Sequence, residues 1–144
     1  MELDLKKALE KAYLETTYSV FVDNERHDIK VGKTIPMVVN QLLEHEKSGV
    51  VLTAFNPRSK SKSIEENHLR NNDLSLHLKK NNYEFYKAVG QGNETLWPAE
   101  ESFLIIGLSP TEAENLAKEF EQYAYIWLEQ NNIANIKFTS IWND

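Results

Sequence analysis

The residues best suited to binding chemistry follow one apolar run and continue into the next helical pattern. The run Val50–Phe55 leads into a loop that begins Asn56-Pro57. Amides and hydroxyls orient a polar ligand, and guanidinium groups bind a carboxylate or phosphate through two hydrogen bonds. We therefore predict a small-ligand site in this stretch. The candidate binding residues are Thr53, Asn56, Arg58, Ser59, Asn67, Arg70 and Asn71.

The spacing within residues 63–81 explains why amides should reach such a site. Ile64, Asn67, Asn71, Leu74 and Leu78 follow one another at steps of three and four residues, so they share one helix face. The aliphatic members make this the buried face. In open α/β sheets, ligands bind beyond the carboxyl ends of strands, beside the next helix N-terminus. The alternative stays open, because buried asparagines also serve as scaffolding that satisfies loop backbone groups.

A pair of carboxylates is the second candidate feature. Glu100 and Glu101 follow Trp97-Pro98 and begin another apolar run. Adjacent strand residues point to opposite faces, so at most one of the two can join an inward site. Either could serve as a general base or cation ligand if buried beside Arg70, and Glu101 is our weak candidate for a catalytic acid or base. The alternative is that one makes a salt bridge and the other faces water. Gln122 and Tyr125 are weaker candidates still, and no other catalytic residue is predicted.

Several better-known motifs are absent. Gly32-Lys33-Thr34 lacks the earlier glycine of a phosphate-binding loop, since His27 occupies that position. Gly90-Gln91-Gly92 is not followed by the helix of a dinucleotide fingerprint. The four histidines lack helical metal-ligand spacing, and the chain has no cysteine. We predict no metal and no cofactor.

Composition bounds the remaining functions. A chain of 144 residues with 41% hydrophobic residues predicts one globular domain spanning 1–144. The net charge of −6 argues against general nucleic-acid binding. The acidic N-terminal residues do not resemble a signal peptide, and no apolar run reaches the roughly 18 residues of a membrane span. We expect a cytoplasmic protein.

The elements that must position these residues follow from periodicity and capping patterns. Ser63 with Glu66 and Ser109 with Glu112 each predict a capping box. The whole pattern predicts an α+β (mixed α/β) fold, in which a single mixed β-sheet has about four helices packed on it. Predicted helices cover 2–15, 36–47, 63–81 and 110–120; predicted strands cover 18–22, 28–31, 50–55, 83–89, 102–107, 123–128 and 136–141.

The ordered combination of these motifs resembles a known family. Its parts are Thr53-Ala54-Phe55-Asn56-Pro57-x-Ser59, Glu66-Asn67-x-x-Arg70-Asn71-x-x-Leu74, Gly90-x-Gly92, Trp97-x-x-Glu100-Glu101-Ser102-Phe103 and Gln122-x-Ala124. The combination, over about residues 13–128, resembles a family of small bacterial proteins known only as a domain of unknown function. The resemblance implies a bacterial, cytoplasmic, single-domain protein and brings no activity, cofactor or catalytic residue. The family pattern has glycine where this chain has Glu121, which leaves the turn after the last helix open.

Two classes of function therefore compete. The first is a domain that binds a small polar or anionic ligand, and whether it is also an enzyme stays open. The second is a non-enzymatic interaction or regulatory module, in which the strand predicted near residues 136–142 pairs with another chain and makes a homo-oligomer.

Overall fold

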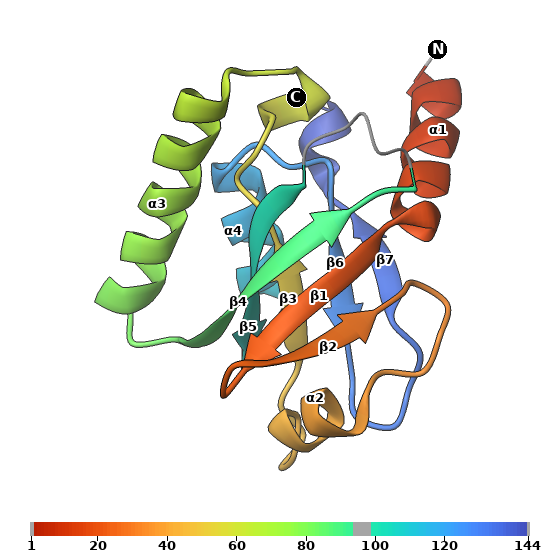
Figure 1. Ribbon diagram of the computed structural model, residues 1–144. Helices are drawn as coiled ribbons and strands as arrows, with labels where there is room; N and C mark the ends of the chain where they lie inside the picture. The colour runs from red at the N-terminus through yellow and green to blue at the C-terminus, as the bar shows by residue number, and fades with distance from the viewer. Residues whose placement is uncertain (1, 94–98, 144) are drawn as a thin grey trace.

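Seven strands form one curled sheet in the order β2-β1-β4-β5-β3-β6-β7 (Figure 1). The structure is a computed structural model, and it describes residues 2–93 and 99–143. The strands are β1 (Thr17–Val22), β2 (Glu25–Ile29), β3 (Gly49–Leu52), β4 (Glu84–Gln91), β5 (Glu100–Ile106), β6 (Ala124–Leu128) and β7 (Asn135–Phe138). The helices are α1 (Glu2–Glu15), α2 (Met37–Leu42), α3 (Ile64–Lys80) and α4 (Pro110–Glu119), with short 3-10 turns at Pro57–Ser59 (η1) and Ser140–Asn143 (η2).

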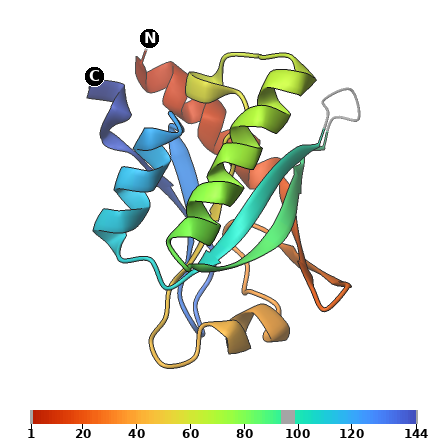
Figure 2. The same cartoon turned by 90° about the vertical axis from the view of Figure 1, so that its left-hand side faces the viewer.

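Helices cover both faces of the sheet. α3 and α4 lie together on one face (Figure 2), where Leu74 and Leu78 join a core with Leu116 and Ala117. α1 and α2 pack on the other face, and Tyr13 of α1 contacts the second core. None of the described helices has the length and apolar character needed to cross a membrane.

Strand β3 is the central element that both cores share. All four of its residues are buried between β5 and β6. Val50 and Leu52 face the core under α3 and α4, and Val51 faces the opposite core. Burial on both faces explains the continuous apolar run, which lacks the alternation of a half-exposed strand.

The α+β class, with one sheet and four helices, is confirmed, but the sheet is antiparallel at every described strand pair, not mixed. Helix α3 links β3 to β4, which both run opposite to the strand between them, β5. Helix α4 likewise links β5 to β6, with β3 inserted between them. Each helix therefore connects two strands that are not neighbours, and an antiparallel strand lies between them. The ligand rule for open parallel sheets consequently does not apply to this fold.

The helix starts follow the local sequence closely. Ser109 accepts a hydrogen bond from the Glu112 backbone, and the Glu112 side chain accepts one from Ser109 N–H, so this capping box is complete. At α3 the Ser63 hydroxyl caps Glu66 N–H at 3.1 Å, but the Glu66 carboxylate lies 3.9 Å from Lys62 Nζ. Only half of that predicted box therefore forms, since the Glu66 carboxylate lies on the side of Lys62.

The turn after α4 is closed by a residue other than glycine. Glu121 has a left-handed φ of +56°. Gln122 N–H donates to Ala117 O at 2.9 Å and Glu121 N–H donates to Lys118 O at 3.0 Å, the paired bonds of a Schellman motif. The turn is thus the one that glycine usually makes, and Glu121 makes it at a cost in backbone strain.

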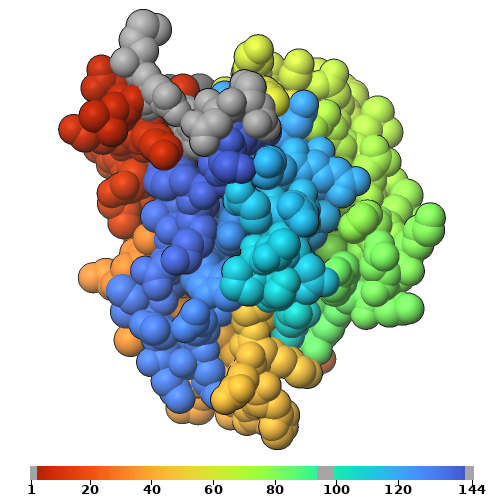
Figure 3. All heavy atoms as spheres, turned by 180° about the vertical axis from the view of Figure 1, so that it is seen from behind, coloured from red at the N-terminus to blue at the C-terminus, as the bar shows by residue number. Residues whose placement is uncertain are grey.

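The end of the chain departs from prediction. The strand predicted at 136–141 ends at Phe138 and is followed by η2, which lies beside α4 (Figure 3). The Thr139 hydroxyl donates to Gln122 O at 2.8 Å, and Ser140 N–H donates to the Glu114 carboxylate at 3.0 Å. These contacts turn the chain away from the sheet onto α4.

Candidate functional site

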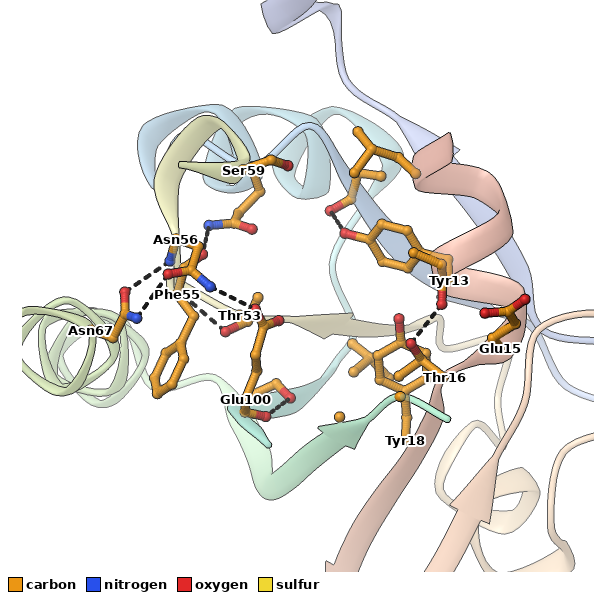
Figure 4. Close-up of a pocket in the computed structure, with 18 of the residues that line it drawn as sticks. Tyr13, Glu15, Thr16, Tyr18, Thr53, Phe55, Asn56, Ser59, Asn67 and Glu100 are labelled. Atoms are coloured by element: carbon orange, nitrogen blue, oxygen red, sulfur yellow. Dashed lines mark hydrogen bonds between the residues drawn. The ribbon is translucent and has the colours of Figure 1, made fainter. Parts of the chain in front are cut away.

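A cavity of about 540 Å³ lies between α1 and the segment that follows β3 (Figure 4). Its size is within the range of small-molecule sites, roughly 300–1,000 Å³. Among the described residues, the charged side chains that line it are Glu15, Lys62 and Glu100.

The structure divides the predicted ligand residues into two groups. Those that line the cavity are Thr53, Asn56, Ser59 and Asn67. Those that do not are Arg58, Arg70 and Asn71. Both groups lie around the carboxyl end of β3, but two amides and two hydroxyls line the open space, whereas the two arginines and the Asn71 amide do not.

Asn56 and Asn67 form a reciprocal pair at the edge of the cavity. Asn67 Oδ1 accepts a hydrogen bond from Asn56 N–H at 2.8 Å, and Asn67 Nδ2 donates to Asn56 Oδ1 at 2.9 Å. Asn56 Oδ1 also accepts from Lys62 N–H at 3.1 Å. Asn56 has a φ of +47°, a conformation that asparagine tolerates better than most residues. The pair thus fastens the loop after β3 to α3.

Asn71 and Arg70 hold the backbone between β3 and η1. Asn71 Oδ1 accepts from Ala54 N–H at 3.3 Å, and Arg70 Nε donates to Ala54 O at 3.2 Å. Asn71 is 4% exposed, as its place on the inner face of α3 predicts. These contacts are structural, since they join two parts of the fold.

The two arginines gather around one acid outside the cavity. Arg70 Nη2 lies 3.5 Å from one Glu121 carboxylate oxygen, and Arg58 Nε lies 3.9 Å from the other. Arg58 N–H also donates to Glu121 O at 2.7 Å. The left-handed turn after α4 thereby gives both cations a partner away from the cavity.

The two carboxylates at the start of β5 face opposite ways, as strand alternation predicts. The cavity receives Glu100, whereas the Glu101 side chain is 49% exposed and contacts His68 Nδ1. Glu101 therefore lies apart from both the cavity and Arg70. Trp97 and Pro98, which precede this pair, lie outside the described residues.

Glu100 is the acidic side chain placed to exchange a proton or a hydrogen bond with a bound molecule. Its Oε1 accepts from Asn56 Nδ2 at 3.0 Å. Burial raises the pKa of Glu100 above its ordinary value, and the bond from Asn56 only partly opposes that rise. Among the described residues, no hydrogen bond reaches the other oxygen, Oε2.

Two tyrosines face Glu100 from the opposite side of the cavity (Figure 4). The rings of Tyr13 and Tyr18 stack with centroids 6.3 Å apart, and Tyr13 Oη donates to Ala124 O at 3.1 Å. Burial, followed by the charge of Glu100, raises the pKa of Tyr13 well above its usual range, so the phenol stays protonated. A Cβ on Gly90 would lie 3.2 Å from the Tyr18 ring, so the absence of a side chain at Gly90 lets the ring pack against the β4 backbone.

Sequence reasoning did not identify these tyrosines as site residues. Tyr13 belongs to the inner stripe of α1, and Tyr18 to an apolar strand, so each has the pattern of a core residue. Gln122 was a weak candidate, and it lines the cavity while its Nε2 donates to Phe55 O at 3.0 Å. Within residues 2–93 and 99–143, no three histidine or acidic side chains come together to hold a metal ion.

Comparison with protein families gives one match. The family described as Protein of unknown function (DUF3293) matches residues 52–125, just over half of the chain. The chain belongs to this family. The DUF3293 segment starts at the last residue of β3 and contains Asn56, Asn67 and Glu100. No curated protein and no solved structure matches the chain.

Proposed function

We propose that this protein binds a small polar organic molecule in the cavity between α1 and the loop after β3. The observation that carries the proposal is Glu100, a partly buried carboxyl beside open space, with one hydrogen bond from the described residues. Burying a carboxylate destabilises a fold unless partners compensate for the lost hydration. A bound molecule would supply the compensation that the protein itself gives only in part.

Scaffolding accounts for part of the polar cluster but not for all of it. The amides of Asn67 and Asn71 have partners in the loop backbone, so their burial needs no ligand. Glu100 differs because its single partner, Asn56 Nδ2, needs only a neutral acceptor, and the amide oxygen of a glutamine would serve the fold equally well. The acidic group is therefore better explained by binding than by stability.

The interaction-module hypothesis has less support. Strand β7 lies at the sheet edge, but it has only four residues and carries Lys137. Short edge strands with lysine resist pairing with other chains. Lys6 of α1 also lies 5.3 Å from the Phe138 ring centroid, so α1 covers part of this strand.

A fragment screen by protein-detected NMR tests the proposal. We expect small polar fragments to shift the backbone amide signals of Asn56, Asn67 and Glu100, while signals from the far face of α3, such as Leu76, stay unchanged. Broad absence of hits, or hits that map away from the cavity, would overturn the proposal. The same screen on Glu101→Gln is the matched control, because Glu101 faces away from the cavity.

A further inference from the structure

We propose that the molecule bound in this cavity is a small organic amine, whose ammonium group lies between the Glu100 carboxylate and the rings of Tyr13 and Tyr18. The inference rests on the proposed function, since it names the chemical class of ligand for the same cavity. Three features carry it: the sign of the charge in the cavity, the acceptor that Glu100 leaves open, and the aromatic wall opposite.

The cavity carries uncompensated negative charge. Among the described lining residues the acids are Glu100 and Glu15, and the single cation is Lys62. Lys62 Nζ lies 3.9 Å from Glu66, and its side chain is 38% exposed, so solvent and Glu66 screen its charge. A carboxylate or phosphate ligand would meet Glu100 without a buried cation to balance it, whereas a cationic ligand would meet a partly buried anion.

The arginines that suggested an anion site lie elsewhere. Arg58 and Arg70 do not line the cavity, and both lie within 4 Å of the Glu121 carboxylate. Neither guanidinium is therefore among the groups that could balance the charge of Glu100 within the cavity.

One oxygen of the Glu100 carboxylate is available to accept a hydrogen bond from a ligand. Asn56 donates to Oε1, which orients the carboxylate, and Oε2 receives no hydrogen bond from the described residues. An ammonium group supplies three donors and a full positive charge, so one ligand group would satisfy this oxygen and offset the charge.

The aromatic wall suits the same ligand group. Tyr13 and Tyr18 form a stacked pair on the side of the cavity opposite Glu100 (Figure 4). Faces of aromatic rings attract cations within about 6 Å of the ring centroid, more strongly where water is excluded. Apolar lining by Leu9, Val51 and Phe55 would accommodate the body of the molecule.

The experiment compares three probes that share one benzyl or phenyl body: benzylamine, benzyl alcohol and benzoate. Titrations are followed by NMR and calorimetry with the wild type, Glu100→Gln and the control Glu101→Gln. We expect benzylamine to bind at least about tenfold more tightly than benzyl alcohol, because hydrogen bonds to charged groups are the stronger ones. We expect benzoate to bind weakest of the three. Glu100→Gln should remove the preference for the amine, and Glu101→Gln should keep it.

A second measurement covers the case in which Glu100→Gln fails to fold. In the wild type, the affinity for benzylamine should fall as pH is lowered from about 7 to about 4, since protonation removes the Glu100 charge. Where the variant folds, its affinity should be flat over that range, which separates Glu100 from Glu15. Equal or stronger binding of the alcohol or the benzoate, or a wild-type affinity independent of pH, would overturn the inference. Probes that shift cavity signals without any preference for the amine would leave the proposed function standing, whereas no binding in the cavity would remove both.

Discussion

Replacing Asn67 by alanine gives the sharpest test of how the cavity wall is built. The change removes the acceptor of Asn56 N–H and the donor to Asn56 Oδ1, at 2.8 and 2.9 Å respectively. Asn56 Oδ1 keeps a partner in Lys62 N–H, and the bond that Asn67 Nδ2 donates to Lys62 O is long, at 3.5 Å, so the main uncompensated group is the Asn56 N–H. Leaving one partly buried donor unsatisfied costs about 1–3 kcal/mol, which we take as about 2 kcal/mol here.

The matched control is Asn72→Ala, an exposed site on the same helix. Both changes gain the same helix propensity, so the difference between the two variants isolates the lost hydrogen bonds. Measured by urea unfolding, Asn67→Ala should be about 2 kcal/mol less stable than Asn72→Ala. In thermal unfolding this corresponds to a difference in Tm of about 4–8 °C for a chain of this size.

A difference below about 0.5 kcal/mol would refute this reasoning, since that is the usual range for surface substitutions. It would mean that water or a rearranged loop replaces Asn67, and that Asn56 does not depend on α3. Amide NMR signals of the loop distinguish these cases, because a rearranged loop shifts the signals of residues 56–62 and bound water leaves them in place.

Three further predictions concern other parts of the fold. Burial raises the pKa of Glu100, so the ionised carboxylate destabilises the folded state. Glu100→Gln should therefore unfold at a higher urea concentration than the wild type at about pH 7. This difference should vanish below about pH 4, where the wild-type carboxyl is protonated. A variant that is less stable than the wild type at neutral pH would contradict it. At Glu121, glycine should be more stable than alanine by about 1 kcal/mol in urea, because both lose the arginine contacts and only glycine relieves the left-handed strain; equal stability would show that the turn is unstrained. Light scattering should give the monomer mass of 16.7 kDa, because both sheet edges are short and charged, and a stable dimer would restore the edge-pairing hypothesis.

Local patterns in the sequence predicted most elements and failed where distant segments decide the geometry. The four helices and the central strand follow from spacing and from caps such as Ser109 with Glu112. The expectation of a mixed sheet was wrong, because the insertion of antiparallel β5 between β3 and β4 depends on long-range pairing. The same is true of η2, whose start is fixed by the contact between Ser140 and Glu114 of α4.

In the candidate site, too, local spacing predicted some features, and others depend on contacts between distant segments. Helical spacing suffices to bury Asn67 and Asn71, since both lie on the face that carries Leu74. Alternation along β5 shows that only one of Glu100 and Glu101 faces inward, but the choice between them depends on the register of β5 with β4. The aromatic wall could not be predicted from the sequence. Only the fold of the whole chain brings Tyr13 of α1 opposite β5, which begins at residue 100.

The two walls of the cavity have different origins in the chain. The wall with Asn56, Asn67 and Glu100 lies within the residues 52–125 that match the family, and Tyr13 and Tyr18 lie before that segment. The family match thus covers the acidic, amide-rich wall, whereas the aromatic wall comes from residues outside the matched segment. Changes confined to the first eighteen residues would therefore alter the aromatic wall of the cavity while leaving the acidic, amide-rich wall in place.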